Sequence, residues 1–565
     1  MAPIMPKNTG LGIVRLLGLI VVAGAFASSH AAAATEGRRP NVVVIITDDQ
    51  GYGDLGCHVN EKVRTPNIDR FASQSVRFSQ FCVAPVCTPT RASLMTGRYH
   101  HRTGAIDTYQ GRALMQPDEM TIPEVLKSAG YRTGLFGKWH LGDNYPRRPQ
   151  EQGFDEVLMH RGGGMVQPGD PPGSRYMDPV LQHNSAQKDY RGYCTDVFTD
   201  GAIRFIEQGG EQPFFAYVAF NAPHTPLEVP DEWVRPYRGM GLDETTARIY
   251  AMVENIDANV GRLLKRLDEL KLAENTIVLY MHDNGPQQKR FNANLRGLKG
   301  SVYEGGIRSP LFVRWAGTTR PREVDKLAGH IDLFPTLLEL CRAKYEATRP
   351  LDGMSLAPLV LGHKVEWVDR TLFIQWHRGD EPKLYDNCAV RQSRFKLVNG
   401  KELYDLTADP AESKDVAGEH PEVVAELRQK YEHWFADVTK ERRFAAEASP
   451  IVVGSERENP STLTRQDWRG PRANWNPIGL GHWHVAVARG GTYRVTLRFA
   501  PTAADTTARV QFGDVKLSAP LKKDQAACTF EGVKLNEGAA RVDAAVGTQI
   551  SEVGVHYVDV ERVGD

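Results

Sequence analysis

The sequence predicts an α/β fold, in which helices flank a large mixed, mostly parallel sheet. A smaller α+β subdomain and a sandwich-like all-β module follow it. Three observations lead to this prediction. Apolar runs of strand length alternate with helical segments over residues 35–349, shorter strand-like segments accompany one long helix over 350–448, and only strand-like segments follow a polar connection within 449–565. Strands that alternate with helices are typical of parallel or mixed sheets, and strands separated by turn residues are typical of sandwiches.

The first domain begins with the unbroken apolar run Val42–Ile46, which is typical of a strand buried on both faces. Residues 121–143 predict a helix, a glycine stop, a strand and a loop. Two more apolar strands are expected at 213–220 and 275–281, separated by a helical stretch over 245–272. Several of these strands run into polar turn residues, and ligands of open α/β sheets bind beyond the carboxyl ends of the strands. We therefore expect one site built from residues far apart in sequence.

The two later regions are predicted from shorter signals. In the second region, the helix expected over 421–441 has Pro421 near its start, where proline is well tolerated. The third region contains strand-like pieces separated by Gly, Asp and Lys turns. We place the domains at 35–349, 350–448 and 449–565.

Residues 1–34 show the three-part pattern of a signal peptide. Lys7 and Arg15 precede an apolar run from Leu16 to about Ala27, and small residues follow. The run is shorter than the roughly 20 apolar residues that a membrane-spanning helix needs. This predicts an exported protein, periplasmic or secreted, with no stable membrane span after signal removal. An uncleaved membrane anchor is the alternative.

Composition and cysteine usage exclude some classes of protein. The 565 residues carry 69 basic and 69 acidic side chains, so the basic excess typical of nucleic-acid binding is missing and no nucleic-acid partner is expected. The seven cysteines are scattered and show no CxxC pair, which indicates neither a zinc site nor a dense disulfide framework. Cys82 and Cys87 lie close enough in sequence for a disulfide, and that alternative stays open beside a chemical role for Cys87.

Oxygen-bearing side chains follow two of the predicted strands. Asp48 and Asp49 come after the first strand, and Asp283 and Asn284 come after the strand at 275–281. Four such side chains at neighbouring strand ends suit a hard cation, Ca²⁺ or Mg²⁺, better than zinc. Capping of turns is the alternative role for either pair taken alone.

A second set of side chains suits the transfer of an anionic group. Cys87 precedes a segment of helical character, and Arg91 lies one helical turn further on. Two lysines and two histidines stand in other loops, where they can balance an anion and move protons near neutral pH. These four residues are Lys138, His140, His224 and Lys299. A metal, fixed cations and proton shuttles together indicate sulfuryl or phosphoryl transfer.

The motifs that hold these residues resemble those of a known family, the type I, formylglycine-dependent sulfatases, which are arylsulfatase-like members of the alkaline-phosphatase-like superfamily. The matching segments are ITDDQGYGD (46–54), CTPTRASLMTGR (87–98), GKWHLG (137–142), APHTP (222–226), HDNG (282–285), KGSVYEGGIRSP (299–310) and ELYDLTADPAE (402–412). The resemblance runs from about Arg39 to Arg442, and the final β module lies outside it. Both variable positions of the C-x-P-x-R motif are threonine here, a mild departure, since only Cys, Pro and Arg are demanded.

The resemblance implies a role for each of these residues. Cys87 would be oxidised by a maturation enzyme to formylglycine, whose hydrate attacks sulfur and later expels sulfate by elimination. Arg91 and Lys138 would steady the hydrate. Lys299 and His224 would hold the sulfate and the leaving oxygen, and His224 would give that oxygen a proton. His140 would take a proton from the second hydroxyl. The residues implied to bind Ca²⁺ are Asp48, Asp49, Cys87 in its modified form, Asp283 and Asn284.

The resemblance also implies a substrate class, a sulfated saccharide or an aryl sulfate. Trp376, His377 and Arg378 are candidate pocket residues, because an aromatic ring can stack on a sugar face and arginine can bind a carboxylate or sulfate. The loop-rich segment 161–193 could shape the pocket mouth. Two alternatives stay open: a phosphonate or phosphodiester hydrolase that uses the same formylglycine, and a catalytically silent glycan-binding protein that relies on its β module. A merely stabilising role for that module is equally open.

Overall fold

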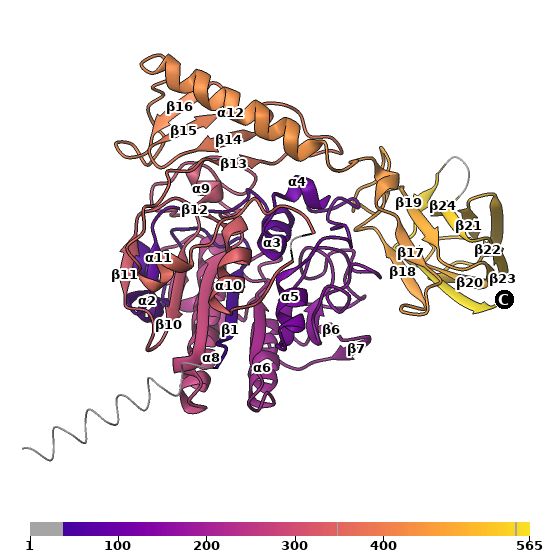
Figure 1. The fold of residues 1–565 in the computed structure, drawn as a ribbon. Coiled ribbons are helices and arrows are strands. Elements are labelled where there is room, and N and C mark those ends of the chain that lie inside the picture. Colours follow the sequence, from indigo (N-terminus) through magenta and orange to yellow (C-terminus); the bar gives the residue numbers. More distant parts are fainter. Residues whose placement is uncertain (1–37, 347, 548–550) are drawn as a thin grey trace, which may run out of the picture.

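The computed structural model describes residues 38–346, 348–547 and 551–565. The predicted signal peptide, residues 1–34, lies outside the described residues. The predicted fold class is confirmed: a large mixed sheet with helices on both faces is followed by separate, smaller sheets (Figure 1). No helix among the described residues is both long and apolar enough to cross a bilayer.

The large sheet contains ten strands within the described residues. Its central strands are parallel neighbours, and antiparallel strands complete both sides. The strands in spatial order are β11 (Arg322–Val324), β2 (Val76–Phe78), β10 (Leu311–Trp315), β9 (Thr276–His282), β1 (Asn41–Thr47), β8 (Phe214–Ala219), β4 (Arg132–Lys138), β5 (Glu156–His160), β6 (Val180–His183) and β7 (Ala186–Asp189).

Alternate residues of β1 enter two different cores, which explains its unbroken apolar sequence. Val42 and Val44 pack in one core, and Val43 and Ile45 pack in the other. The first core is covered by α3 (Cys87–Thr96), α5 (Ile122–Ser128), α10 (Leu333–Leu340) and α11 (Ala357–Leu361). The second is covered by α2 (Pro66–Ser73), α6 (Cys194–Glu207) and α8 (Glu244–Glu269), while α7 (Asp231–Arg238) packs on α8.

Short elements lie at the end of the sheet where the central strands finish. They are α4 (His100–Thr103), α9 (Glu304–Ile307) and the two-stranded pair β3 (Phe81–Cys82) and β12 (Ala328–Gly329). The α+β subdomain covers this end of the main domain (Figure 1). Its antiparallel sheet consists of β13 (Leu372–Gln375), β14 (Cys388–Arg391), β15 (Phe395–Val398) and β16 (Glu402–Asp405), and α12 (Pro421–Thr439) packs on it through Leu427, Tyr431 and Trp434.

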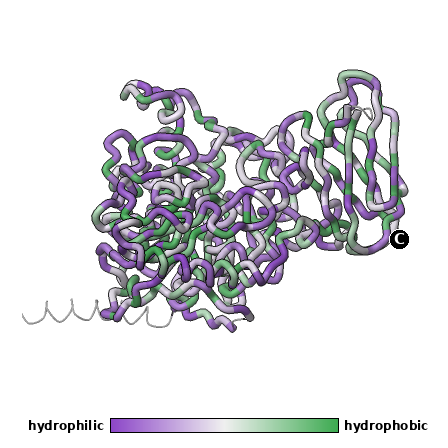
Figure 2. The backbone as a smooth tube through the Cα atoms, turned by 90° about the horizontal axis from the view of Figure 1, so that it is seen from above, coloured by the Kyte–Doolittle hydropathy of each residue, from purple (hydrophilic) through white to green (hydrophobic). Residues whose placement is uncertain are grey.

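The C-terminal β module projects from one side of the main domain in both views (Figures 1 and 2). Two sheets enclose one apolar core, to which Trp483 on β19 and Val558 on β26 both contribute. The first sheet contains β17 (Ile451–Val453), β19 (His482–Val487), β24 (Gly538–Val546), β21 (Thr506–Phe512), β22 (Val515–Leu521) and β25 (Val553–Gly554). The second contains β18 (Ser461–Thr464), β26 (Tyr557–Gly564), β20 (Gly491–Arg498) and β23 (Ala527–Leu535). The domain boundaries given above stay predictions.

Candidate active site

The acidic residues predicted at the strand ends lie side by side. β1 and β9 pair in parallel up to Thr47 and His282, so the residues that follow each strand leave the sheet together. Asp48, Asp49 and Asp283 are all buried, and the backbone N–H of Asp49 donates a 3.2 Å hydrogen bond to Asp283 Oδ1. This contact brings the two predicted pairs into one cluster.

Each of the three carboxylates has a cation beside it. Lys138, at the end of β4, places Nζ 2.5 Å from Asp48 Oδ2. Lys299 Nζ lies 2.7 Å from Asp49 Oδ1. The guanidinium of Arg91 donates two hydrogen bonds to Asp283 Oδ2, at 3.1 and 2.9 Å. We call these six residues, together with Asn284, the strand-end cluster.

The pKa values show how burial and charge compete within the cluster. Burial alone would raise the pKa of Asp49, but the charge of Lys299 and the hydrogen bonds from Lys299 and Asn284 hold it well below its usual range. Burial and the neighbouring Asp48 raise the pKa of Asp283 to about 7, against the pull of Arg91. At Asp283, burial and the neighbouring carboxylate thus outweigh the stabilising charges of Arg91 and Lys138.

The cluster fits a hard cation on two observations. Within the described part of the chain, the buried atoms Asp48 Oδ1 and Asn284 Oδ1 have no hydrogen-bond partner, and such atoms are rare unless something else binds them. One ligand atom each of Asp48, Cys87 and Asp283 lie within 4.8 Å of one another. Carboxylate and amide oxygens are the donors that Ca²⁺ and Mg²⁺ prefer.

Cys87 is the first residue of α3 and is 1% exposed. All ten residues of this helix are buried, which fixes the position of its first turn. Burial raises the pKa of the Cys87 thiol, so the unmodified side chain is neutral and a poor nucleophile. Cys82 and Cys87 are both free in this structure.

His140 faces Cys87. Its Nδ1 lies 3.4 Å from Cys87 Sγ, and its Nε2 lies 2.7 Å from the carbonyl oxygen of Thr108. A carbonyl can only accept, so this contact places the ring proton on Nε2 and leaves Nδ1 as an acceptor toward Cys87. Burial and the charge of Lys138 keep the pKa of His140 well below its usual value, and the ring is neutral. Its geometry suits a base.

His224 lies beside Asp49 and lines the same cavity as His140. Its Nδ1 is 2.6 Å from the carbonyl oxygen of Thr225, and its Nε2 is 3.7 Å from Asp49 Oδ2. Burial lowers the pKa of His224 to about 3 despite the nearby Asp49. This ring is also neutral, and an anion bound beside it would raise its pKa.

A glycine run packs against both histidines. A Cβ on Gly163 would lie 2.6 Å from His140 Cε1, and one on Gly164 would lie 2.8 Å from His224 Cε1. Both distances are shorter than real contacts allow, so side chains here would displace the rings. The loop-rich sequence predicts only that this segment could shape the pocket mouth, although three consecutive glycines at 162–164 are a signal for a close approach.

A cavity of about 810 Å³ opens above the cluster, within the usual range for ligand sites. Six of the predicted residues line it: Cys87, His140, His224, Lys299, Trp376 and Arg378. Arg91, Lys138 and the four oxygen donors lie beneath, joined to these by the contacts described above. His377 is placed elsewhere: it is buried near His100 and His101 and does not line the cavity.

Trp376 and Arg378 are held at the cavity by a buried carboxylate. The indole N–H of Trp376 donates a 3.1 Å hydrogen bond to Asp107 Oδ1, and Arg378 Nη1 lies 2.8 Å from the same oxygen. The Arg378 guanidinium also lies over the rings of Tyr109 and Trp376. Asp107 and Tyr109 stand in no recognised motif, so no sequence signal indicated them.

Comparisons with known proteins agree with this geometry. A family model described as sulfatase matches residues 40–343, and one described as N-sulphoglucosamine sulphohydrolase, C-terminal, matches residues 298–437. Human arylsulfatase A is 33% identical over 66% of this chain and 78% of its own length. The N-acetylgalactosamine-6-O-sulfatase of Bacteroides thetaiotaomicron is 28% identical over 75% of this chain and 99% of its own length.

Solved structures are similar as well. The structure of Ps i-CgsB in complex with k-i-k-neocarrahexaose superimposes with a TM-score of 0.66 at 29% identity, and it covers 72% of this chain and 95% of its own. A structure of BT4656 in complex with D-glucosamine-2-N,6-O-disulfate, 21% identical with a TM-score of 0.58 over 72% of this chain and all but 1% of its own, shares the fold.

Proposed function

Because this chain belongs to the sulfatase family and is a sulfuric ester hydrolase, we propose that it hydrolyses sulfate esters of carbohydrates with a formylglycine made from Cys87 and a bound Ca²⁺. One observation carries the proposal. Cys87, at the first turn of α3, lies 3.4 Å from His140 Nδ1 on the floor of a cavity that His224 and Lys299 also line. Nucleophile precursor, base and anion-binding groups thus share one enclosure.

The strand-end cluster would hold the metal through Asp48, Asp49, Asp283, Asn284 and the modified Cys87. The unpartnered oxygens of Asp48 and Asn284 support this assignment. When bound, Ca²⁺ would balance the buried carboxylates and draw electron density from a sulfate oxygen. Lys138, Lys299 and Arg91 each compensate one carboxylate, which keeps the cluster intact at the base of the cavity.

Formylglycine, made from Cys87 by a maturation enzyme, would supply a hydrated aldehyde whose hydroxyl is the nucleophile and whose breakdown releases sulfate. The chain's own part is to move protons. His140 accepts a proton at Nδ1, because the Thr108 carbonyl keeps the other ring proton at Nε2. The buried, neutral state of His140 at rest leaves that lone pair free.

Lys299 and His224 face the position where sulfate would bind. The Lys299 ammonium offers more donors than its contact with Asp49 uses, and it lines the cavity. An anion beside His224 would favour its protonated form, and the Nε2 proton could then pass to the leaving oxygen. Arg91 and Lys138 lie beneath the cavity and act through the carboxylates they neutralise.

The substrate proposal rests on the cavity wall and on the named relatives. Trp376 offers an indole face, and Arg378 offers a guanidinium for a carboxylate or second sulfate. Similar proteins are named for N-acetylgalactosamine-6-sulfate esters and one was solved with a carrahexaose. We therefore propose a sulfated saccharide as substrate. His377, which lies outside the cavity lining, is left out of this proposal.

We further propose that the protein is exported, on the signal-peptide pattern of residues 1–34. Export would place it where sulfated polysaccharides are found.

A substrate panel tests the function. It contains 4-nitrophenyl sulfate, N-acetylgalactosamine 6-sulfate, D-glucosamine-2-N,6-O-disulfate, a sulfated carrageenan hexasaccharide and a phenylphosphonate monoester. We expect sulfate release from at least one saccharide, and none from the Cys87→Ala variant. Faster cleavage of the phosphonate than of every sulfate would contradict the sulfatase proposal, and saccharide binding without turnover would favour the silent glycan-binding alternative.

A further inference from the structure

The C-terminal β module reaches the candidate active site. The segment between β18 and β19, residues 465–481, carries Trp475 to the cavity wall. The same segment places Gln466 Nε2 2.9 Å from the Thr108 carbonyl oxygen, the atom that also holds His140. In Figure 1 the module lies beside the main domain. It contributes Trp475 and Gln466 to the candidate active site.

Gln466 shows that the module is fitted into the site. It is 2% exposed, and its Nε2 lies 3.5 Å from His140 Nε2. Its Oε1 is buried and has no hydrogen-bond partner among the described residues. The Gln466 amide donates to the Thr108 carbonyl, but its buried oxygen accepts no hydrogen bond among the described residues. An unsatisfied buried oxygen costs folding free energy, which is unfavourable in a contact that only stabilises the fold.

Direct contacts also join this segment to the main domain. The side chain of Gln110 donates to the carbonyl of Ala473, and the backbone N–H of Gly111 donates to the carbonyl of Gln466 at 3.3 Å. Arg469 Nη2 donates to the Gly111 carbonyl at 2.9 Å. Leu114 of the main domain packs within the apolar core of the module. These contacts hold the module, and Trp475 with it, against the main domain.

Trp475 is held with part of its indole uncovered. Its Nε1 donates a 3.2 Å hydrogen bond to the Arg465 carbonyl, and its ring meets Tyr109 edge to face at 5.5 Å between centroids. The residue remains 38% exposed and lines the cavity. Tyr109, Trp376 and Trp475 come from the main domain, the α+β subdomain and the β module respectively. We call these three residues the aromatic rim.

We propose that Trp475 binds a sugar ring of the substrate, so that the aromatic rim is a saccharide subsite built jointly by three parts of the chain. The proposal rests on the sulfatase function proposed above. The negative face of an indole attracts the polarised C–H groups on one face of a pyranose, and burial of that face removes apolar surface from water. The Arg465 carbonyl and the Tyr109 ring already hold the indole of Trp475. Binding therefore costs little side-chain conformational entropy.

The subsite would be a property of this chain's C-terminal extension. The two family models end at residues 343 and 437, well before Trp475. Arg378, which lies 4.6 Å over the Tyr109 ring and 4.9 Å over the Trp376 ring, adds a cation between two members of the rim. This favours an anionic saccharide, which carries sulfate or carboxylate beyond the ester that is cleaved.

Three variants test the role of Trp475. Trp475→Leu keeps an apolar contact with Tyr109 but removes the aromatic face, Trp475→Phe keeps an aromatic face, and Ile478→Ala is a control at an exposed position of the same segment. For the carrageenan hexasaccharide we expect Trp475→Leu to raise KM about tenfold, equivalent to about 1.4 kcal/mol, with kcat changed less than threefold. Trp475→Phe should recover most of the loss, Ile478→Ala should match the wild type, and 4-nitrophenyl sulfate should discriminate little among them.

Binding measured without turnover separates this inference from the sulfatase function. In the Cys87→Ala background, calorimetric titration should give a Kd for the hexasaccharide that Trp475→Leu raises about tenfold and Ile478→Ala leaves unchanged. A wild-type chain that releases no sulfate from any ester would overturn the proposed function, while this titration would still decide the subsite. Three outcomes would each overturn the inference. The first is an unchanged Kd for Trp475→Leu, the second is an equal loss of affinity for Trp475→Leu and Trp475→Phe, and the third is no binding of any saccharide in the panel.

Discussion

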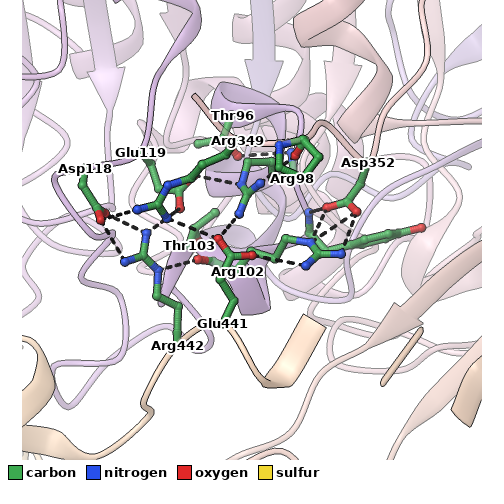
Figure 3. A network of polar contacts seen from close by, with 12 residues as sticks. Thr96, Arg98, Arg102, Thr103, Asp118, Glu119, Arg349, Asp352, Glu441 and Arg442 are labelled. Atoms are coloured by element: carbon green, nitrogen blue, oxygen red, sulfur yellow. Dashed lines mark hydrogen bonds and ion pairs between the residues drawn. The ribbon is translucent and has the colours of Figure 1, made fainter. Parts of the chain in front are cut away.

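Two clusters of buried charge meet the chain at α3 and just beyond it, one through Arg91 and the other through Arg98, and they differ in which polar atoms stay without a partner. The strand-end cluster holds three carboxylates and three cations beneath the cavity. The second cluster, shown in Figure 3, joins α4 and its neighbours to the segment after α12. We call it the arginine–carboxylate network; it consists of Arg98, Arg102, Arg349 and Arg442 with Asp118, Glu119, Asp352 and Glu441.

The network pairs its charges with one another. Even Arg98 Nε and Glu119 Oε2, which are buried without a hydrogen-bond partner among the described residues, face each other as an ion pair at 3.1 Å. Glu119 is 2% exposed and has three arginines around it, with Arg442 at 2.7 Å and Arg98 and Arg349 at 3.1 Å. Arg349 and Arg442 stand in segments remote from Glu119 in sequence, so the network connects the main domain to the α+β subdomain. Its charged groups form ion pairs with one another, which is typical of a structural junction.

The strand-end cluster also pairs its charges, but two of its oxygen atoms remain available to bind a ligand. Asp48 Oδ1 and Asn284 Oδ1 are buried without partners in the described structure, and a cavity opens above them. Burial of charge therefore does not mark the functional site. Unpartnered carboxylate and amide oxygens beside a cavity do.

The largest effect is expected at Cys87. Cys87→Ala removes the precursor of the proposed nucleophile, so kcat/KM for the best saccharide sulfate should fall by at least about 10⁴, the scale of losing a nucleophile. The melting temperature should move by no more than about 4 °C, because only one sulfur atom is removed. Sulfate release and differential scanning calorimetry give the two values. Residual activity above one per cent would show that another group attacks.

Glu119→Gln should produce the opposite pattern. It leaves three arginines around a neutral amide, and breaking such a buried pair costs about 3–5 kcal/mol of unfolding free energy. The kcat of the folded enzyme at 25 °C should stay within threefold of the wild type. Asp118→Asn, at a half-exposed carboxylate in the same network, is the matched control and should cost less than about 1 kcal/mol. Urea denaturation measures both, and equal costs would contradict the contrast.

Gly164→Ala tests the fit of the glycine run against His224. The added Cβ would lie 2.8 Å from His224 Cε1, so the ring must shift, and a displacement near 1 Å costs about 10²-fold in kcat/KM. Gly418→Ala, where a Cβ meets no atom within 4 Å, is the control and should leave kinetics unchanged. Wild-type kinetics for Gly164→Ala would show that His224 needs no fixed position.

A smaller effect concerns the histidines beside the network. Burial lowers the pKa of His101 to about 3 and that of His330 to about 4, so the folded protein keeps both neutral where the unfolded chain binds protons. Stability from these groups is present above the unfolded pKa near 6.5 and is lost as pH falls toward the folded values. We expect His101→Gln to reduce the slope of unfolding free energy between pH 4 and 6 by about 1.4 kcal/mol per pH unit.

The control for that slope is His433→Gln, an exposed histidine on α12. It should leave the pH dependence as in the wild type. Urea midpoints measured at several pH values give both slopes, and an unchanged slope for His101→Gln would mean that His101 is protonated in the folded state.

Much of the site could be predicted because it follows from local pattern and sheet topology. Asp48 and Asp283 come together because the two buried strands that precede them are parallel neighbours. Cys87 and Arg91 share a helix, so their spacing alone brings them to one side of it. Only the pairing of strands had to be assumed.

Other features depend on tertiary contacts that no local pattern encodes. The Thr108 carbonyl that orients His140 is a backbone atom, and Gln466 and Trp475 reach the site only because the β module docks in one position. His377 lies two residues beyond the end of β13, between Trp376 and Arg378. Successive side chains of extended backbone point to opposite sides, which explains why Trp376 and Arg378 line the cavity and His377 does not.

The central claim is that Cys87 becomes an aldehyde, and mass spectrometry of the tryptic peptide 78–91 tests it most directly. The protein should be made in its native host, where the maturation enzyme is available, and the peptide FSQFCVAPVCTPTR analysed before and after treatment with hydroxylamine. We predict an aldehyde at Cys87 that hydroxylamine traps, with Cys82 still a thiol. An intact thiol at Cys87, or a disulfide between Cys82 and Cys87, would contradict the proposed mechanism.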